Sequence, residues 1–244
     1  MPTSQIQSPA QVQSLFDRIA PSYDELNQRL SLGLHRIWKG ITVQMACPPR
    51  GSQVLDICCG SGDLALLLAQ QVGRQGTVVG LDFSEHLLQI ARRRSRLTFP
   101  GHTFDWILGD ALRLPFAADQ FTAITMGYGL RNVIDIPQAL QEIHRVLKPG
   151  SRAAVLDFHR SPYWGVSWFQ ELYLERIVVP AAARLGVGDE YEYIYPSLET
   201  FPTAAEQLAL ATTVGFDQSH YYPLTGGLMG ILLVQKSIPP PLIP

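Results

Sequence analysis

The fold of this chain is indicated first by Val54-Leu-Asp-Ile-Cys-Cys-Gly-Ser-Gly-Asp63. The stretch opens as a short apolar strand that carries a carboxylate, Asp56, and passes into the turn Gly60-Ser-Gly62. Glycines without a Cβ let the backbone come close to a ligand. Leu64, Leu67 and Leu68 then recur at helical spacing. A strand, a glycine turn and a helix in this order predict a ligand site at the carboxyl end of a parallel strand.

The sequence on both sides continues this alternation of strands and helices. Further strands are expected near residues 77–81, 105–108, 121–126 and 153–158, with Ser84 and Asp135 as N-caps of the intervening helices. Thr203-Ala-Ala-Glu206 is a capping box before a last helix, and strands near 217–222 and 228–235 are expected to pair antiparallel. The pattern predicts an α/β fold with a doubly wound, mostly parallel, seven-stranded, Rossmann-like sheet.

We expect one domain, residues 1–244, with recognisable parts. Helical periodicity predicts an N-terminal helical cap over 10–48, ahead of a cofactor-binding half over 49–159. Residues 160–202 break the alternation and are expected to form an insert that covers the substrate. A C-terminal helix and hairpin follow over 203–236, and the proline-rich residues 237–244 are expected to be a flexible tail.

The composition excludes several classes of function. A net charge of −2 gives no positive field for nucleic acid, and Arg92, Arg93, Arg94 and Arg96 are interpreted as the solvated face of a helix. Three cysteines without metal-ligand spacing predict no metal site and a reducing, cytoplasmic location. No apolar run reaches the roughly 20 residues of a membrane-spanning helix, and the N-terminal residues do not resemble a signal peptide.

Two nucleotide ligands are compatible with the glycine turn. Gly60-Ser-Gly-Asp-Leu-Ala65 fits the pattern of an NAD site, and Asp82 lies 20 residues after Gly62, where such sites place an acid. However, Asp56 and Asp63 would repel the pyrophosphate of NAD. S-adenosylmethionine has no phosphate and carries an ammonium and a sulfonium, so the charges favour this cofactor.

Three acids end three successive strands and are expected to share the same sheet edge. Asp56 is expected to receive the methionine ammonium of S-adenosylmethionine. Asp82 can accept from the ribose hydroxyls, and Asp110 from the adenine amine. Helix capping is the competing interpretation for each acid taken singly.

Several longer motifs resemble the C-methyltransferases of menaquinone and ubiquinone biosynthesis. They are Tyr23-Asp-Glu-Leu-Asn27, Ser31-Leu-Gly-Leu-His-Arg-Ile-Trp-Lys39, Gly129-Leu-Arg-Asn-Val133, Arg145-Val-Leu-Lys-Pro-Gly150 and Gly226-Gly-Leu-Met-Gly230. The resemblance runs from about Phe16 to Lys236. Residues 124–131 and 178–180 are most similar to the cyanobacterial and plastid branch, which methylates a prenylated naphthoquinol, and a prenylated benzoquinol is the alternative acceptor.

The resemblance also implies which residues act. Its cofactor contacts fall on Ser61, Asp82, Asp110, Ala111 and Gly127, and we add Asp56, Gly60 and Gly62 from the glycine turn. Its polar active-site set falls on Arg131, Asn132 and Tyr23. Arg131 is expected to stabilise the phenolate of the acceptor, whereas a surface salt bridge is the competing interpretation. Asp24, His35, His144 and His159 are the other candidates for a base.

The insert carries a wide apolar helix face that includes Trp164, Trp168, Leu172, Tyr173 and Ile177. This face is interpreted either as core packing or a homodimer contact, or as a lid for an isoprenoid chain with peripheral membrane contact. Methyl transfer to nitrogen or oxygen, and a scaffold that binds the cofactor without turnover, are the competing functions.

Overall fold

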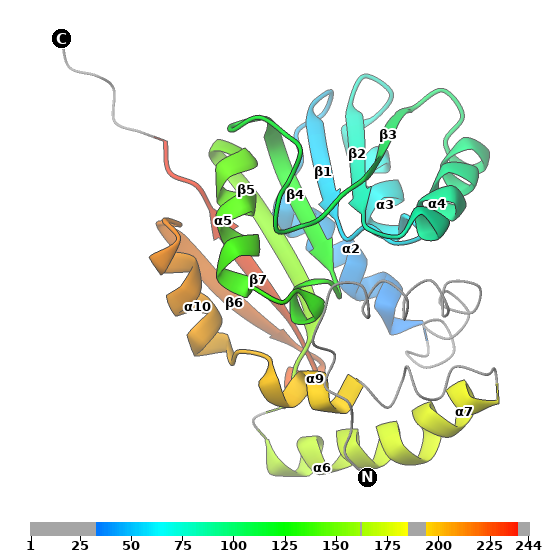
Figure 1. Ribbon diagram of the computed structural model, residues 1–244, viewed down its shortest axis with the longest axis vertical. Helices are drawn as coiled ribbons and strands as arrows, with labels where there is room; N and C mark the ends of the chain where they lie inside the picture. The colour runs from blue at the N-terminus through cyan, green and yellow to red at the C-terminus, as the bar shows by residue number, and fades with distance from the viewer. Residues whose placement is uncertain (1–32, 162, 185–193, 239–244) are drawn as a thin grey trace.

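The protein is described by a computed structural model that covers residues 33–161, 163–184 and 194–238 (Figure 1). Its centre is one seven-stranded sheet in the order β3-β2-β1-β4-β5-β7-β6. The five strands from β3 to β5 are parallel, and β7 is antiparallel to both β5 and β6. The strands are β1 (Gln53–Ile57), β2 (Thr77–Asp82), β3 (Thr103–Leu108), β4 (Phe121–Gly127), β5 (Leu147–Phe158), β6 (Gln218–Leu224) and β7 (Met229–Gln235). The predicted fold class is therefore confirmed, including the final antiparallel pair.

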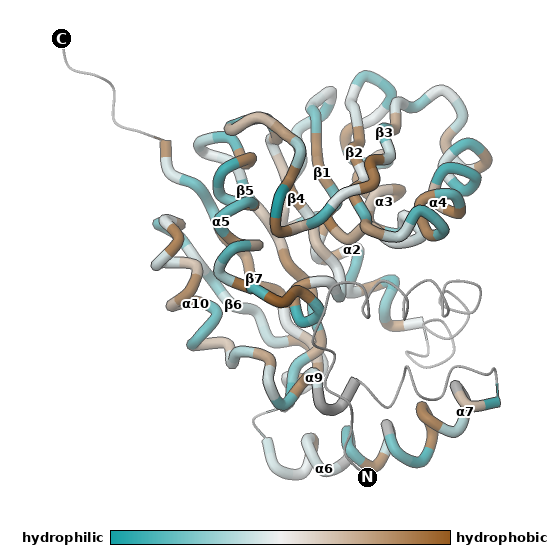
Figure 2. Tube along the Cα trace, viewed as in Figure 1, coloured by the Kyte–Doolittle hydropathy of each residue, from teal (hydrophilic) through white to brown (hydrophobic). Residues whose placement is uncertain are grey.

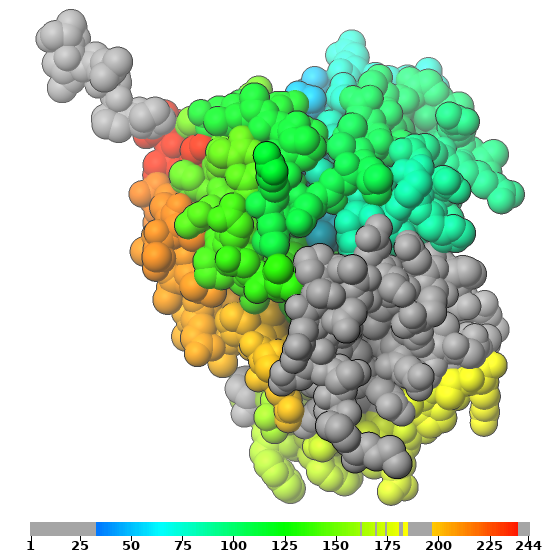
Figure 3. All heavy atoms as spheres, in the orientation of Figure 1, coloured from blue at the N-terminus to red at the C-terminus, as the bar shows by residue number. Residues whose placement is uncertain are grey.

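Helices cover both faces of the sheet. One face packs against α2 (Leu34–Ala46), α3 (Asp63–Val72) and α4 (Glu85–Thr98), and the other against α5 (Ile136–Val146) and α10 (Ala204–Thr213). Figure 3 shows α10 with β6 (orange) on one flank of the molecule and α4 on the opposite flank.

Two apolar cores lie on the two faces, because successive strand residues point to opposite sides. Leu55 and Ile57 of β1 join Leu140 of α5 in one core, whereas Val54 joins Leu68 of α3 in the other. In Figure 2 the hydrophobic colour accordingly gathers along the central strands and the hydrophilic colour on the outer helices.

Side-chain caps start three helices at the positions that the sequence predicts. The hydroxyl of Ser84 accepts from the N–H of Leu87, and the carboxylate of Asp135 accepts from the N–H of Gln138. Thr203 and Glu206 form the reciprocal capping box. The fifth strand differs from its prediction: it begins at Leu147, directly after α5, because Leu147 already pairs with Phe121 before a register shift.

The insert lies at the end of the sheet where β4 passes into η1 (Leu130–Asn132) (Figure 1). It contains α6 (Trp164–Tyr173), the π-helical turn η2 (Leu174–Val178), α7 (Val179–Ala183) and α9 (Ile194–Thr200), and α9 packs on η1. The core-packing interpretation of its apolar face is wrong at three positions. Trp164 is 84% exposed, Trp168 57% and Ile177 51%.

Candidate active site

The candidate site lies at the carboxyl edge of the parallel strands, beside β1. The chain runs outward from β1 to β2 and β3, and then crosses back to β4 on the other side of β1. Ligands of open α/β sheets bind in the crevice that such a reversal leaves. A small cavity of about 30 Å³ opens here, and four of the predicted cofactor residues are among those that line it: Asp56, Gly60, Ser61 and Gly127.

Asp56 is a buried acid with one unused oxygen. It is 1% exposed, and its Oδ1 accepts from the Thr125 hydroxyl at 2.8 Å. Its Oδ2 has no hydrogen-bond partner in the part of the chain that the structure describes. Burial raises the pKa of this carboxyl to about 7, against the lowering effects of Thr125, the Ala65 backbone and Lys39. A buried oxygen that needs a donor fits an ammonium group, which is what the methionine end of S-adenosylmethionine offers.

Asp82 ties the glycine turn to the end of β2. Its Oδ2 accepts from the N–H of Gly60 at 2.8 Å, and its Oδ1 accepts from the N–H of Ser84 at 2.9 Å. Carboxylates have about four lone-pair positions, so both oxygens can still accept from ribose hydroxyls. Asp82 therefore shapes the loop at the edge where the sequence predicts a ligand contact.

Two cations meet the glycine turn from different helices. Lys39 of α2 pairs with Asp63 at 2.6 Å, and Arg94 of α4 pairs with the same carboxylate at 2.6 Å. Arg94 also donates to both oxygens of Ser61, at 2.8 and 2.9 Å. Burial alone would raise the pKa of Asp63, but the two cations lower it to about 2.

The interpretation of the arginine run as a solvated helix face is therefore wrong for Arg94, although it holds for the exposed Arg93 and Arg96. The reason is geometric. The spacing within α4 gives no sign that one arginine points across to the glycine turn, which is 33 residues away from Arg94 in the chain at Ser61.

The remaining predicted cofactor residues lie along the carboxyl edge of the sheet and differ in how far they are buried. Gly127 ends β4, and an added Cβ there would lie 2.7 Å from Leu64 Cδ1, so the end of the Leu64 side chain would have to shift. Ala111 is buried, whereas Asp110 is exposed and accepts from the N–H of Leu112 at 2.9 Å. The exposed Asp110 carboxylate is open to a ligand amine.

Arg131 and Asn132 lie in η1, directly after β4, as the sequence predicts. The Arg131 side chain is 9% exposed, and its Nε lies 3.1 Å from Asp157 Oδ1 in a buried ion pair. Its Nη1 donates to Asn132 Oδ1 at 3.2 Å, and Asn132 Nδ2 donates to the Tyr128 carbonyl at 2.7 Å. Arg131 is thus a partner in a salt bridge, but a buried one at the end of β5 rather than a surface contact.

An aromatic stack joins the two polar regions. Lys39 lies over the ring of Tyr128 at 5.4 Å, Tyr128 stacks on Phe158 at 5.1 Å, and Arg131 lies over Phe158 at 5.5 Å. Cations favour the faces of aromatic rings. Tyr128 has a φ of 60°, a left-handed conformation that costs a residue with a side chain about 1–3 kcal/mol. The surrounding contacts must hold that strain, which is common at functional sites.

His159 is a poor base in this environment. It is 8% exposed, its Nε2 lies 3.0 Å from Gln207 Nε2, and burial lowers its pKa to about 4. It is therefore neutral at ordinary pH and fixed against α10. Of the other candidates, Tyr23 and Asp24 lie outside the described residues, and His144 packs edge-on against Phe216.

Neither cysteine of the glycine turn is a reactive thiol. Burial raises the pKa of both Cys58 and Cys59 well above the ordinary value, and the neighbouring Asp82 and Asp56 raise it further. The thiolate is the nucleophilic form. No group of histidine, cysteine and acidic residues that could hold a metal ion occurs in the described part of the chain.

Comparisons with known proteins agree with this geometry. Residues 4–236 match the profile of the ubiE/COQ5 methyltransferase family. A 2-phytyl-1,4-naphthoquinone methyltransferase of Nostoc punctiforme is 54% identical over 93% of this chain and 98% of its own. The chloroplastic 2-phytyl-1,4-beta-naphthoquinone methyltransferase of Arabidopsis thaliana is 46% identical over 91% of this chain and 86% of its own. A putative S-adenosylmethionine-dependent methyltransferase structure from Methanococcus maripaludis shares the fold, with a TM-score of 0.66, 16% identity, and coverage of 98% of this chain and 99% of its own.

Proposed function

Since the chain belongs to the ubiE/COQ5 methyltransferase family, with S-adenosylmethionine as its methyl donor, we propose that it methylates a ring carbon of a prenylated naphthoquinol. The acceptor is inferred from the relatives, whose names specify 2-phytyl-1,4-naphthoquinone, at up to 54% identity over nearly the whole chain. The proposed reaction converts 2-phytyl-1,4-naphthoquinol to phylloquinol, or demethylmenaquinol to menaquinol. A benzoquinol acceptor is the alternative.

The observation that best supports the donor site is the buried Asp56 with its unpartnered Oδ2. We assign the methionine ammonium to Asp56 and the carboxylate of the donor to Lys39, which faces the same cavity. Gly60, Ser61, Gly62 and Gly127 let the backbone approach the donor, while Asp82 takes the ribose and Asp110 with Ala111 the adenine. When bound, S-adenosylmethionine supplies a methyl group on a positively charged sulfur.

The acceptor must be electron-rich at the carbon that receives the methyl group. A quinone ring is electron-poor, whereas a quinol that loses its hydroxyl proton carries negative charge on the adjacent ring carbon. Arg131 would stabilise that phenolate and Asn132 would orient the hydroxyl or a water molecule, with Tyr23 as a third polar group. This chemistry needs orientation and charge stabilisation, and no covalent intermediate with the protein.

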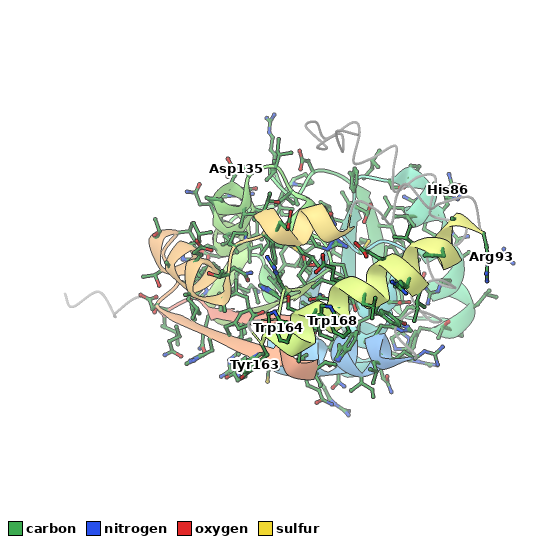
Figure 4. All side chains as sticks on the ribbon, turned by 90° about the horizontal axis from the view of Figure 1, so that it is seen from below. His86, Arg93, Asp135, Tyr163, Trp164 and Trp168 are labelled. Carbon is green, nitrogen blue, oxygen red and sulfur yellow. The ribbon has the colours of Figure 1, made fainter. Side chains whose placement is uncertain are left out.

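A prenylated acceptor resides in a lipid phase, so the enzyme must reach it there. No helix of the described residues is long and apolar enough to cross a bilayer. Figure 4 looks at the molecule from the side of α6 and shows Tyr163, Trp164 and Trp168 together at the start of that helix. Their exposures are 65%, 84% and 57%. Tyrosine and tryptophan favour membrane–water interfaces, so this surface supports peripheral membrane contact by a cytoplasmic enzyme, with a homodimer contact as the alternative.

The acceptor is tested with reduced and oxidised substrates. We expect labelled methyl transfer from S-adenosylmethionine to 2-phytyl-1,4-naphthoquinol only when a reductant such as dithionite keeps the ring reduced. Mass spectrometry of the product would place the methyl group on carbon. Equal rates with the oxidised quinone would refute the mechanism. Faster turnover of a prenylated benzoquinol would instead assign the protein to the alternative acceptor.

A further inference from the structure

We infer that Asp157 is a positioning residue for the acceptor reaction, because it fixes the direction of the Arg131 guanidinium without touching substrate. The inference rests on the proposed function of Arg131. Asp157 lies near the carboxyl end of β5 and is 2% exposed. None of the roles proposed for the donor site or the acceptor site uses this carboxylate.

Asp157 holds Arg131 at two points. Its Oδ2 accepts from the backbone N–H of Arg131 at 3.0 Å, which anchors the start of η1 to β5. Its Oδ1 lies 3.1 Å from Arg131 Nε in an ion pair that does not have hydrogen-bond geometry, and it accepts from the backbone N–H of Phe158 at 2.8 Å. One carboxylate thus fixes both the backbone and the near side of the guanidinium, which leaves the side chain little freedom to turn.

Two further contacts define the direction of the guanidinium. The ring of Phe158 lies under it, with Arg131 Cζ at 5.5 Å from the ring centre, and Nη1 donates to Asn132 Oδ1. The Nε side therefore faces inward to Asp157, and the Nη side faces the region after β4. Among the described residues no acceptor is bonded to Nη2, so this nitrogen is available to a phenolate oxygen.

Asp157 does not itself act as the base. Both oxygens already accept backbone N–H groups, and the carboxylate is sealed from solvent. Burial raises the pKa of Asp157, whereas Arg131 and three backbone N–H groups lower it. A buried arginine that lost this partner would be uncompensated and would turn toward water. Without Asp157, the Arg131 guanidinium would keep its charge but would no longer point toward the acceptor.

The test compares Asp157→Asn with a second carboxylate–arginine pair, in which the carboxylate side chain is 12% exposed and the arginine side chain 37% exposed. Glu142 of α5 also accepts from a backbone N–H, that of Leu114 at 2.7 Å, and from an arginine, Arg145, at 2.7 Å. We expect Asp157→Asn to lower kcat about ten- to hundredfold, less than the roughly hundred- to thousandfold of removing a charge donor, because the guanidinium is still present. KM for S-adenosylmethionine should stay within about threefold of the wild-type value. Glu142→Gln should lower the melting temperature and leave kcat unchanged.

A double-mutant cycle separates positioning from general damage. In an Arg131→Ala background, already about a hundredfold slower, Asp157→Asn should change kcat by less than about twofold because there is no guanidinium to aim. An equal loss of kcat in both backgrounds, or wild-type kcat in Asp157→Asn, would overturn the inference. If Asp157→Asn does not fold, Asp157→Glu keeps the charge on a longer arm, and full kcat in that variant would overturn it as well.

All ratios are taken against wild-type turnover of whichever reduced quinol the protein methylates. If the wild-type protein is inactive with reduced naphthoquinol, the proposed acceptor is refuted. If the wild-type protein is active but Asp157→Asn lowers kcat equally with and without Arg131, only the role of Asp157 is refuted.

Discussion

At the scale of single residues, Asp56 is a buried carboxylate whose Oδ2 has no hydrogen-bond partner among the described residues. The pKa near 7 means that this carboxyl changes its charge within the ordinary working range of pH. Only the ionised form attracts an ammonium group. A donor bound at Asp56 must therefore be sensitive to pH where a solvent-exposed aspartate would not be.

We expect the affinity for S-adenosylhomocysteine, which carries the same ammonium, to be full above pH 7 and to fall below it. The decline should approach about tenfold per pH unit, as one carboxyl protonates before binding. The folded pKa is raised, so protonation is favoured in the free protein, and binding below pH 7 should release a proton. Titration calorimetry between pH 5.5 and 8 in two buffers would measure both effects. Asp56→Asn should bind more weakly with no such slope, and a slope that persists in this variant would assign the titration to another group.

At the scale of elements, the glycine turn fixes how α3 begins. Gly62 is the N-cap of α3 with a φ of 91°, a region that residues with a Cβ avoid. A Cβ there would lie 3.0 Å from the ring of Trp106 and 3.2 Å from the Cβ of Ala91. The same ring covers Gly80, where a Cβ would lie 2.4 Å away. The turn is therefore set by packing against β3 and α4 as well as by its own sequence.

Gly62→Ala should destabilise the protein by about 1–3 kcal/mol, from backbone strain. Gly40→Ala is the matched control, because Gly40 is inside α2, has no positive φ, and has nothing within 4 Å of its added Cβ. That substitution should stabilise by about 0.5–1 kcal/mol through helix propensity. Urea unfolding would give both values, and equal stability of the two variants would show that the turn tolerates a side chain.

Sequence patterns predicted most elements but not the contacts between them. Ser84, Asp135 and Thr203 were predictable as caps because a cap acts on the N–H groups two or three residues ahead. The acids of β1 and β2 were predictable because strand ends share one sheet edge. Arg94, which reaches the glycine turn from α4, was not predictable, and neither was the exposure of Trp164, since both depend on where distant elements pack. The roles of the site residues, Tyr23 included, stay predictions.

At the scale of the whole molecule, ligand binding should stabilise the fold because the site joins many elements. Lys39 comes from α2, Asp63 from α3 and Arg94 from α4, and all three meet at the glycine turn. A ligand that binds only the folded form adds about 2.7 kcal/mol at a hundred times its dissociation constant. The thermal stability of the whole protein should therefore show which nucleotide binds.

S-adenosylhomocysteine should raise the melting temperature by several degrees in a concentration-dependent way, whereas NAD should not. The ionised Asp56 carboxylate favours an ammonium and repels a pyrophosphate, whereas the charge of Asp63 is already balanced by Lys39 and Arg94. Differential scanning fluorimetry with both ligands at equal concentrations would show the difference. A larger shift with NAD would reverse the choice of nucleotide.

The position of β7 has a consequence for how the chain is made. This strand is the last in sequence among the described residues, yet it lies inside the sheet, where Val155 of β5 pairs with Leu232. During synthesis on a ribosome, β5 emerges well before β7, so the edge of β5 that pairs with β7 stays unpaired and exposed in the meantime. Such edges are templates for pairing with other chains, and contacts between distant residues form slowly. The nascent polypeptide thus passes through an aggregation-prone interval that ends only when β7 has been synthesised and can pair with β5.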